Sequence, residues 1–300
     1  MKRRSCLRIL AALCFAATAG ITLSSCGGGG GATSANTIKI GSLQSTTGGT
    51  STFGLSSNKG IRLAAEERNA AGGVLGKKLD IILADDQSQN SLVREAVLKL
   101  IMQDHVCAIL GEVASGRTAA AAFDCQHSKI PLLTPASTAN DITENGDYIF
   151  RSCYTDAQQG RWIADFAIHN LKLTRAALFT DSQNTYSIGL SKVIEAEYTK
   201  AGGTLVAKEN YSAGNQDFQS QLTNIRAANP QIIFLPGYYT EIVKIVPQAR
   251  KLGITVPFIG GDGWDSDVTI KQGGDAVNGC YYTDHYAPDD PDPRVQAFVK

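Results

Sequence analysis

The sequence predicts a doubly wound α/β fold arranged as two lobes, each a parallel sheet flanked by helices. From Thr37 onward, short apolar runs alternate with stretches of helical period, which is typical of parallel strands joined by crossover helices. This rhythm breaks at two extended segments, around residues 148–155 and 280–286, which we expect to be hinge strands between the lobes. With 300 residues, 43% of them hydrophobic and 19% charged, the chain is long enough to form two cores.

The first 25 residues predict a lipoprotein signal peptide. Four basic residues precede the apolar run Ile9–Ile21, which is too short to span a membrane as a mature helix. The run ends in Leu23-Ser24-Ser25-Cys26, which resembles a bacterial lipobox, where cleavage leaves a cysteine that carries lipid. Cys26 is therefore the predicted lipidation site, and glycine-rich residues 26–37 form a flexible linker. The alternative is an ordinary secretory signal.

Each element of the fold follows from an apolar run or a helical period. The predicted strands of the first half are Ile38–Ser42, Leu79–Ala84, Val106–Leu110 and Ile130–Leu133. Those of the second half are Ala176–Phe179, Thr204–Lys208, Ile232–Leu235 and Phe258–Ile259. The predicted helices include Lys59–Ala70 (closed by Gly72-Gly73), Ser91–Gln103, Gln158–Asn170 and one that starts after Pro293.

Composition disfavours several classes of protein. Removal of a signal that holds four basic residues leaves an acidic chain, so nucleic acid is not expected as a partner. No metal or cofactor is predicted, and the motifs of common catalytic sites are absent; Ser56-Ser57-Asn58-Lys59 fits a Ser-x-x-Lys pattern without its partner motifs. The four histidines are scattered, and we expect them on the surface. After the signal and Cys26, Cys107, Cys125, Cys153 and Cys280 remain, either as disulfides or as buried free thiols.

Residues that follow the strands predict the binding site, because ligands of open α/β sheets bind outside the carboxyl ends of the strands. In the first half these residues are small hydroxyls at helix starts, above all in Thr134–Asp141, and they suit a carboxylate. In the second half they include tyrosines and the carboxylate of Asp262, which suit an ammonium group. The sequence thus predicts a site for a small zwitterion between the lobes.

Four segments carry a resemblance to a known family: Gly72–Leu79, Ala84–Asp86, Thr134–Thr138 and Gly237-Tyr238. They resemble the branched-chain amino acid (Leu/Ile/Val-type) substrate-binding proteins of ABC transporters, in the type I periplasmic binding protein family. The resemblance implies two Rossmann-like lobes that close on a small branched-chain or other aliphatic amino acid. It also implies delivery to an ABC permease and an extracytoplasmic protein without enzymatic activity. Together with the predicted lipobox, it leads us to expect a lipid-anchored monomer.

The same resemblance implies the ligand-binding residues. Ser115 and Thr138 match side-chain partners of the ligand carboxylate, and Asp262 stands where the family has a glutamate that pairs with the ammonium. The shorter aspartate shifts the expected ammonium geometry. The full predicted set is Phe53, Ser115, Ala136, Ser137, Thr138, Tyr186, Tyr238 and Asp262.

Domain boundaries follow from the two breaks. We expect lobe 1 to comprise residues 38–154 and 285–300, and lobe 2 residues 155–284. Family members return to lobe 1 after the second connector, whereas this chain ends at Lys300, so we expect apolar surface of lobe 1 to be exposed. Two alternatives stay open: a ligand-sensing receptor domain of the same fold, and an amide, urea-type or aromatic-acid ligand.

Overall fold

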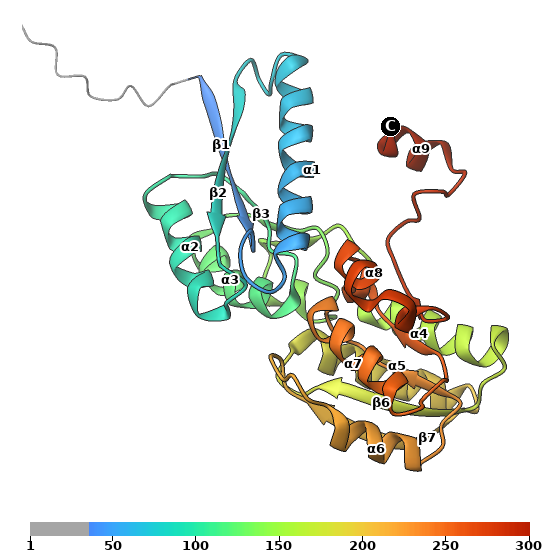
Figure 1. Ribbon diagram of the computed structural model, residues 1–300. Helices are drawn as coiled ribbons and strands as arrows, with labels where there is room; N and C mark the ends of the chain where they lie inside the picture. The colour runs from blue at the N-terminus through green and yellow to red at the C-terminus, as the bar shows by residue number, and fades with distance from the viewer. Residues whose placement is uncertain (1–35) are drawn as a thin grey trace, which may run out of the picture. The chain divides into compact units, whose positions relative to one another are not determined.

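Residues 36–300 are described by a computed structural model, and they contain two five-stranded parallel sheets (Figure 1). The first sheet has the order β2-β1-β3-β4-β5. Its strands are β1 (Thr37–Gln44), β2 (Lys78–Asp85), β3 (Ile109–Gly111), β4 (Leu132–Thr134) and β5 (Ile149–Arg151). The second has the order β10-β9-β8-β6-β7. Its strands are β6 (Arg175–Asp181), β7 (Thr204–Tyr211), β8 (Ile232–Phe234), β9 (Phe258–Gly260) and β10 (Tyr281–Tyr282).

The two sheets repeat one winding pattern. If strands are counted from the first strand of each sheet, both read 2-1-3-4-5, and every strand pairing is parallel. The predicted α/β class with two parallel sheets is therefore confirmed. The predicted lobe boundaries stay a prediction.

Helices cover the first sheet unequally. Helix α1 (Ser51–Ala70) lies on one face, and α2 (Asn90–Met102) and α3 (Ser115–Ser128) lie on the other (Figure 1). The face under α2 and α3 holds a core that includes the fully buried Leu43, Leu100 and Ile109. On the opposite face Leu133 and Phe150 are 36% and 48% exposed. Among the described residues, this face of the first sheet is therefore partly exposed.

The second sheet is buried on both faces, as the alternation of its strand residues shows. Ala176 and Leu178 of β6 join a core with α4 (Asp156–Asp165) and α5 (Thr185–Lys200), whereas Ala177 and Phe179 face α6 (Gln219–Ala227) and α7 (Tyr239–Lys251). A π-helical turn, Phe166–Asn170, extends α4. The short helices are Ile142–Asn145, Asp262–Trp264, Gly274–Val277, α8 (Asp267–Gly273) and α9 (Pro293–Val299).

The two extended connectors differ from their prediction in one respect: each begins as an edge strand of its own sheet. β5 pairs with β4 inside the first connector, and β10 pairs with β9 inside the second. Helix α1 begins at Ser51, eight residues before the predicted start, and the predicted Gly72-Gly73 cap is present, with Gly73 N–H donating to the Arg68 carbonyl (2.8 Å). Both glycines have positive φ, which favours glycine.

All four cysteines of the described region are free thiols. Burial raises the pKa of Cys125 and of Cys153 to about 12, so these two stay protonated and unreactive near neutral pH. Among residues 36–300, no helix has the length and apolar character needed to cross a membrane. The predicted signal peptide, Cys26 and most of the linker lie outside the described residues.

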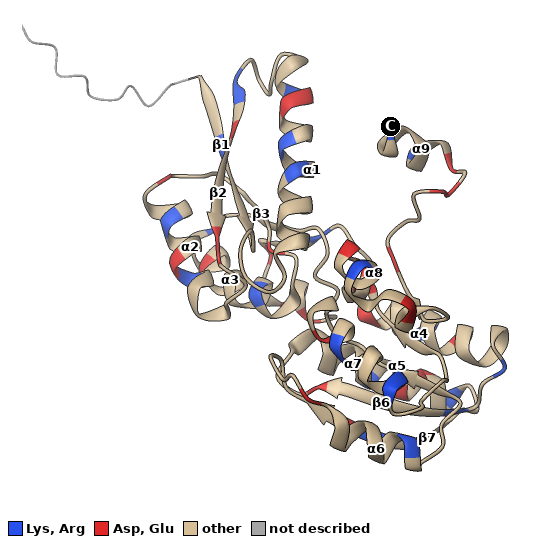
Figure 2. Cartoon of the chain, in the orientation of Figure 1, with Lys and Arg blue, Asp and Glu red and all other residues tan. Residues whose placement is uncertain are grey.

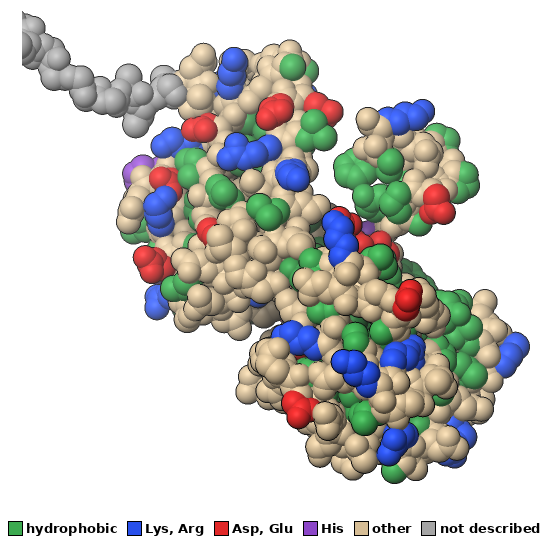
Figure 3. Space-filling view, in the orientation of Figure 1, with side chains coloured by type: hydrophobic (Ala, Val, Ile, Leu, Met, Phe, Trp, Pro, Cys, Tyr) green, Lys and Arg blue, Asp and Glu red, His purple; other side chains and the backbone are tan. Residues whose placement is uncertain are grey.

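The visible surface shows mixed charge and one aromatic area. Basic and acidic side chains are interspersed along α1, α2 and α7 (Figure 2). Hydrophobic side chains gather beside α4 (Figure 3), where Trp162, Tyr281 and Tyr282 are exposed. They line a cavity of about 590 Å³ at the β10 edge of the second sheet.

Candidate functional site

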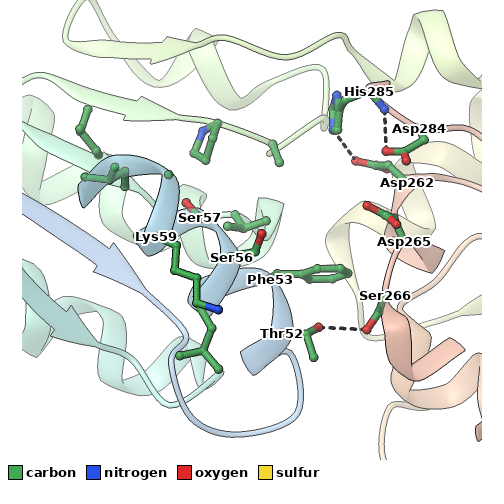
Figure 4. Close-up of a pocket in the computed structure, with 18 of the residues that line it drawn as sticks. Thr52, Phe53, Ser56, Ser57, Lys59, Asp262, Asp265, Ser266, Asp284 and His285 are labelled. Carbon is green, nitrogen blue, oxygen red and sulfur yellow. Dashed lines mark hydrogen bonds and ion pairs between the residues drawn. The ribbon is translucent and has the colours of Figure 1, made fainter. Parts of the chain in front are cut away.

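One cavity of about 990 Å³ extends from the face of β1 and β2 beside α1 to residues that follow strands of both sheets. Phe53 enters it from α1, Ser115 from the start of α3, and Tyr186 from the start of α5. Figure 4 shows side chains of α1 on one side of the cavity and a group around Asp262 and His285 on the other. The predicted residues that line this cavity are Phe53, Ser115, Ala136, Thr138, Tyr186, Tyr238 and Asp262.

The wall from the first sheet offers a hydrogen-bond donor at a helix start. Ser115 is 2% exposed, and its Oγ accepts from the Ala139 N–H (3.2 Å), which leaves the hydroxyl proton available for a ligand. As the first residue of α3, Ser115 lies where unpaired backbone N–H groups and the helix dipole favour an anion. This wall is suited to a carboxylate.

Asp262 provides the carboxylate of the opposite wall. Its Oδ2 lies 3.4 Å from His285 Nε2 (Figure 4), and its Oδ1 is buried without a hydrogen-bond partner among residues 36–300. The Tyr186 hydroxyl lies nearby and accepts from the Gly263 N–H (3.2 Å); burial, together with the Asp262 charge, raises the pKa of Tyr186. A buried carboxylate oxygen that lacks a donor is suited to an ammonium ligand.

His285 is exposed, as the sequence predicts for the histidines, but it also takes part in the site. Its side chain lines the cavity and stacks on Tyr154 (4.4 Å between ring centroids). Burial alone would lower the pKa of His285, but the hydrogen bond to Asp262 and the charge of Asp262 outweigh burial and raise that pKa. In the absence of ligand, Asp262 therefore has a titratable cation as its partner.

Acidic residues near Asp262 make this wall markedly negative. Asp265 and Asp284 also line the cavity (Figure 4). Burial is the main cause, and repulsion from Asp265 the second, of a pKa of Asp284 raised to about 6. Burial raises the pKa of Asp265 as well. Excess negative charge at this wall favours a cationic group on the ligand.

Ser137 does not reach the cavity. Its side chain is fully buried and donates to the carbonyls of Glu112 (3.2 Å) and Val113 (3.0 Å), with the Thr118 hydroxyl at 2.5 Å. Thr134 Oγ1 donates to the same Glu112 carbonyl (2.6 Å). In the geometry of the structure, Ser137 holds the loop after β4 against the loop after β3 and presents no hydroxyl to a ligand.

Beneath the first-sheet wall lies a buried ionic network that the sequence analysis missed. Arg117 Nε lies 3.1 Å from Glu112 Oε2 and 3.7 Å from Asp86 Oδ2, and its Nη2 donates to Thr50 Oγ1 (2.7 Å). Ser45 Oγ contacts both carboxylates, Asp86 at 2.5 Å and Glu112 at 2.9 Å. Burial raises the pKa of Asp86 and of Glu112 despite the Arg117 charge. Asp86 and Glu112 each follow a strand, so their place after a strand was the available signal.

Contacts between the two halves surround the cavity. Tyr239 Oη donates to the Gly49 carbonyl (2.7 Å), and Thr52 Oγ1 lies 3.2 Å from Ser266 Oγ (Figure 4). Rings of Phe53 and Tyr238 meet edge to face at 6.0 Å, and Tyr238 stacks on Tyr186 at 5.3 Å. These aromatic walls can accommodate an apolar ligand side chain. No group of three or more His, Cys, Asp or Glu side chains in the described region is arranged to hold a metal ion.

A protein whose two parallel sheets share one cavity at their strand ends belongs, by fold and site, to the class of two-sheet α/β binding proteins. Comparison with known proteins identifies the family: a family model described as periplasmic binding protein matches residues 37–300. The chain is a member of the periplasmic binding protein family.

Its relatives include amino acid binders. An amino acid binding protein from Pseudomonas aeruginosa is 32% identical over 249 residues, which are 82% of this chain and 66% of that protein. The crystal structure of leucine binding protein LivK from Thermotoga maritima is 38% identical, with a TM-score of 0.84 over 87% of this chain and 74% of that one. The substrate binding protein LivJ from Streptococcus pneumoniae, solved with isoleucine, is 34% identical, with a TM-score of 0.78 over 82% and 70%.

Among the solved neighbours are proteins that hold a different class of ligand, an aromatic acid. A solute binding protein from Rhodopseudomonas palustris, in complex with 3,4-dihydroxybenzoic acid, is 25% identical with a TM-score of 0.78 over 88% of this chain and 72% of that one. The chain thus spans about two thirds to three quarters of the length of these proteins.

Proposed function

We propose that this protein is an extracytoplasmic substrate-binding protein that captures a small aliphatic α-amino acid and delivers it to an ABC permease. The observation that carries the proposal is a single cavity with a hydroxyl at a helix start on one wall and a buried carboxylate oxygen without a donor on the other. Ser115 and the α3 N-terminus bind the ligand carboxylate, and Asp262 binds the ammonium. Phe53 and Tyr238 contact the aliphatic side chain.

Capture works by closure of two lobes, residues 38–154 with 285–300 and residues 155–284, around the ligand. Ligand groups that contact both walls gain all of their bonds only when the walls approach, so binding shifts the hinge equilibrium toward the closed state. Thr138 and Ala136 complete the carboxylate wall, and Ser137 supports their loop. The ligand leaves unchanged, and the protein acts as a monomer tethered to the membrane by lipid on Cys26.

Calorimetry with a panel of related ligands tests the proposal. We expect leucine, isoleucine or valine to bind, and 4-methylpentanoic acid and isopentylamine, which lack the amino or carboxyl group of leucine, to bind at least tenfold more weakly. NMR of the mixture should show the ligand unaltered after prolonged incubation. Tighter binding of a ligand without an amino group would contradict the zwitterion assignment.

A second candidate ligand is an aromatic carboxylic acid. The stacked Tyr186 and Tyr238 rings, with Phe53 at the edge of Tyr238, form a wall that could hold an aromatic ring, and one solved neighbour binds such an acid. The negative wall around Asp262, Asp265 and Asp284 favours the amino acid, because an aromatic acid brings no cation to it. Including 3,4-dihydroxybenzoate in the same titrations distinguishes the two classes.

A further inference from the structure

A buried amide, Gln159, joins the two walls of the site at the point where both connectors pass. It is the fourth residue of α4, and its side chain is fully buried. Its Nε2 donates to Asp156 Oδ1 (2.8 Å) and to Thr138 Oγ1 (3.3 Å). Its Oε1 accepts from Thr283 Oγ1 (2.8 Å) and from the Asp262 N–H (3.3 Å). Both amide hydrogens and both lone pairs of the oxygen are therefore used.

The four partners come from four places in the chain. Thr138 follows β4 of the first sheet, Asp156 begins α4 after the first connector, Asp262 follows β9 of the second sheet, and Thr283 follows β10 in the second connector. Thr138 and Asp262 are the residues predicted to meet opposite ends of a zwitterionic ligand. One side chain thus fixes the loops that present both ends of the site.

Close packing leaves this amide little freedom to move. A Cβ atom on Gly261 would lie 2.7 Å from Gln159 Oε1 and 2.3 Å from the Tyr186 hydroxyl, so glycine at this position is what allows the approach. A second tie runs beside the amide, because the Asp156 N–H donates to the Thr138 carbonyl (2.7 Å). Glutamine satisfies all four partners, whereas leucine satisfies none, asparagine is one methylene too short, and ionised glutamate has no hydrogen to donate to Asp156.

We infer that Gln159 is a positioning residue that sets the spacing between Thr138 and Asp262, and through it the affinity for a ligand with groups at both walls. The inference rests on the proposed function, because it assigns those walls to the two ends of an amino acid. Gln159 has no contact with the cavity itself: the cavity-lining residues do not include it. Its effect on the ligand is exerted through the loops that it holds.

The test compares Gln159→Glu and Gln159→Leu with the control Gln158→Glu in the full chain. Gln158 is exposed and belongs to the capping box of α4 with Thr155, a role that glutamate also fills, so the control makes the same amide-to-acid change one residue away. Leucine affinity should fall at least 30-fold at pH 8 in both Gln159 variants and stay within twofold of the wild type in the control.

A pH series separates positioning from a general loss of structure. The carboxyl introduced by Gln159→Glu would lie beside Asp156 on α4 and near Tyr186 on α5, and the charges of Asp262 after β9 and Arg151 of β5 also act on this cluster. When protonated it regains a donor, so the affinity of this variant relative to the wild type should rise at least tenfold as the pH falls from 8 to 5.5. Gln159→Leu should show no such recovery.

A measurement without ligand decides the inference even if amino acids do not bind. Amide hydrogen exchange by NMR reports directly on the Asp262 N–H, which donates to Gln159. We expect it to exchange at least tenfold faster in Gln159→Leu and unchanged in the control. If the wild-type protein binds no amino acid, the proposed function is overturned. The exchange rate of the Asp262 amide then tests the role of Gln159 by itself. An unchanged Asp262 amide, or Gln159 variants that bind leucine within threefold of the wild type, would overturn the inference.

Discussion

In the proposed site, Asp262 supplies the carboxylate that distinguishes ligands with an amino group from those without one. Replacing it by asparagine leaves a ligand ammonium without its counter-charge in a closed site, where truncating one partner of a buried ion pair costs about 2–5 kcal/mol. We expect Asp262→Asn to lose this much affinity for leucine and much less for 4-methylpentanoic acid. Titration calorimetry of both ligands measures the difference, and an equal loss for the two would remove Asp262 from the ammonium site.

The partner of Asp262 in the free protein, His285, makes binding depend on pH. Because the pKa of His285 is raised, the imidazole is cationic below that pKa and competes with the ligand ammonium for Asp262. As the pH rises through that pKa, His285 becomes neutral and the competition ends. We expect leucine affinity to increase roughly three- to tenfold between about pH 6 and about pH 8.5.

The variant His285→Gln should flatten this profile, because glutamine does not titrate. Calorimetry at four pH values in one ionic strength is sufficient for the comparison. The charges of Asp265 and Asp284 also raise the pKa of His285. Protonation of these two acids therefore contributes to the same dependence of leucine affinity on pH. A wild-type affinity that is constant or falls over this range would contradict competition by the imidazole.

Protonation of Asp156 makes the free energy of unfolding larger at low pH. Burial raises its pKa to about 7, so the folded protein holds this proton more tightly than the unfolded chain does. The stability that protonation provides is present at low pH and is lost as the pH rises from the unfolded pKa near 4 through the folded pKa. Asp156→Asn should therefore be more stable than the wild type at pH 8, by on the order of 1–3 kcal/mol.

Urea unfolding at pH 5 and pH 8 measures this effect. The control Asp165→Asn changes a half-exposed acid on the same helix and should alter the free energy of unfolding by less than about 0.5 kcal/mol at either pH. If Asp156→Asn destabilises the protein equally at both pH values, burial of its charge is not what limits stability there.

Among the elements, the loops after β1, β2 and β3 are held together by Arg117. Removing the guanidinium leaves Asp86 and Glu112 buried without a cation, which typically costs about 3–5 kcal/mol. We expect Arg117→Met to lose this much stability, and Lys271→Met, which breaks an exposed pair with Asp267, to lose less than about 1 kcal/mol. Chemical denaturation of both variants makes the comparison. Adding Glu112→Gln to Arg117→Met should restore part of the loss, and no restoration would argue against charge burial.

The same network explains why sequence reasoning placed the start of α1 eight residues too late. Thr50 precedes the helix but makes no side-chain cap; its hydroxyl instead accepts from Arg117 Nη2 and lies 3.1 Å from Ser88 Oγ. The first turns of α1 are thus fixed by tertiary contacts that carry no local signal. Strands were easier to predict, because each is an apolar run between polar turns.

The site residues that directly follow strands could be predicted from the sequence. Residues after β3 and β4 lie together because parallel strands of one sheet end at a common edge, and the segment after β9 of the second sheet lines the same cavity. His285 and Gln159 could not be found in this way. His285 follows an edge strand that the sequence presents as a connector, and Gln159 lies inside α4, so only the assembled structure brings both beside Asp262.

For the molecule as a whole, the proposed lipid anchor determines where the binding site works. Cys26→Ala removes the thiol to which lipid would be attached, so the variant should lose its stable membrane association while leucine affinity is unchanged. Membrane fractionation with detection of the lipidated species measures the first, and calorimetry the second. A variant that still sediments with membranes after processing would indicate an ordinary secretory signal or another anchor.

Because the two sheets share one winding order, each of them contributes one wall of the cavity. The preference for each end of the ligand can therefore be considered wall by wall. Each wall of the cavity is built from short loops that follow the strands of one sheet, with the hydroxyl wall on the first sheet and the acidic wall on the second, and Gln159 joins the two. Mutation or protein design can therefore change the sequence of the segment after β9, residues 260–266, without changing a strand of the first sheet. Under the proposed function, change toward ligands that keep a carboxylate but lack an amine would be concentrated in that segment and in its contact with Gln159.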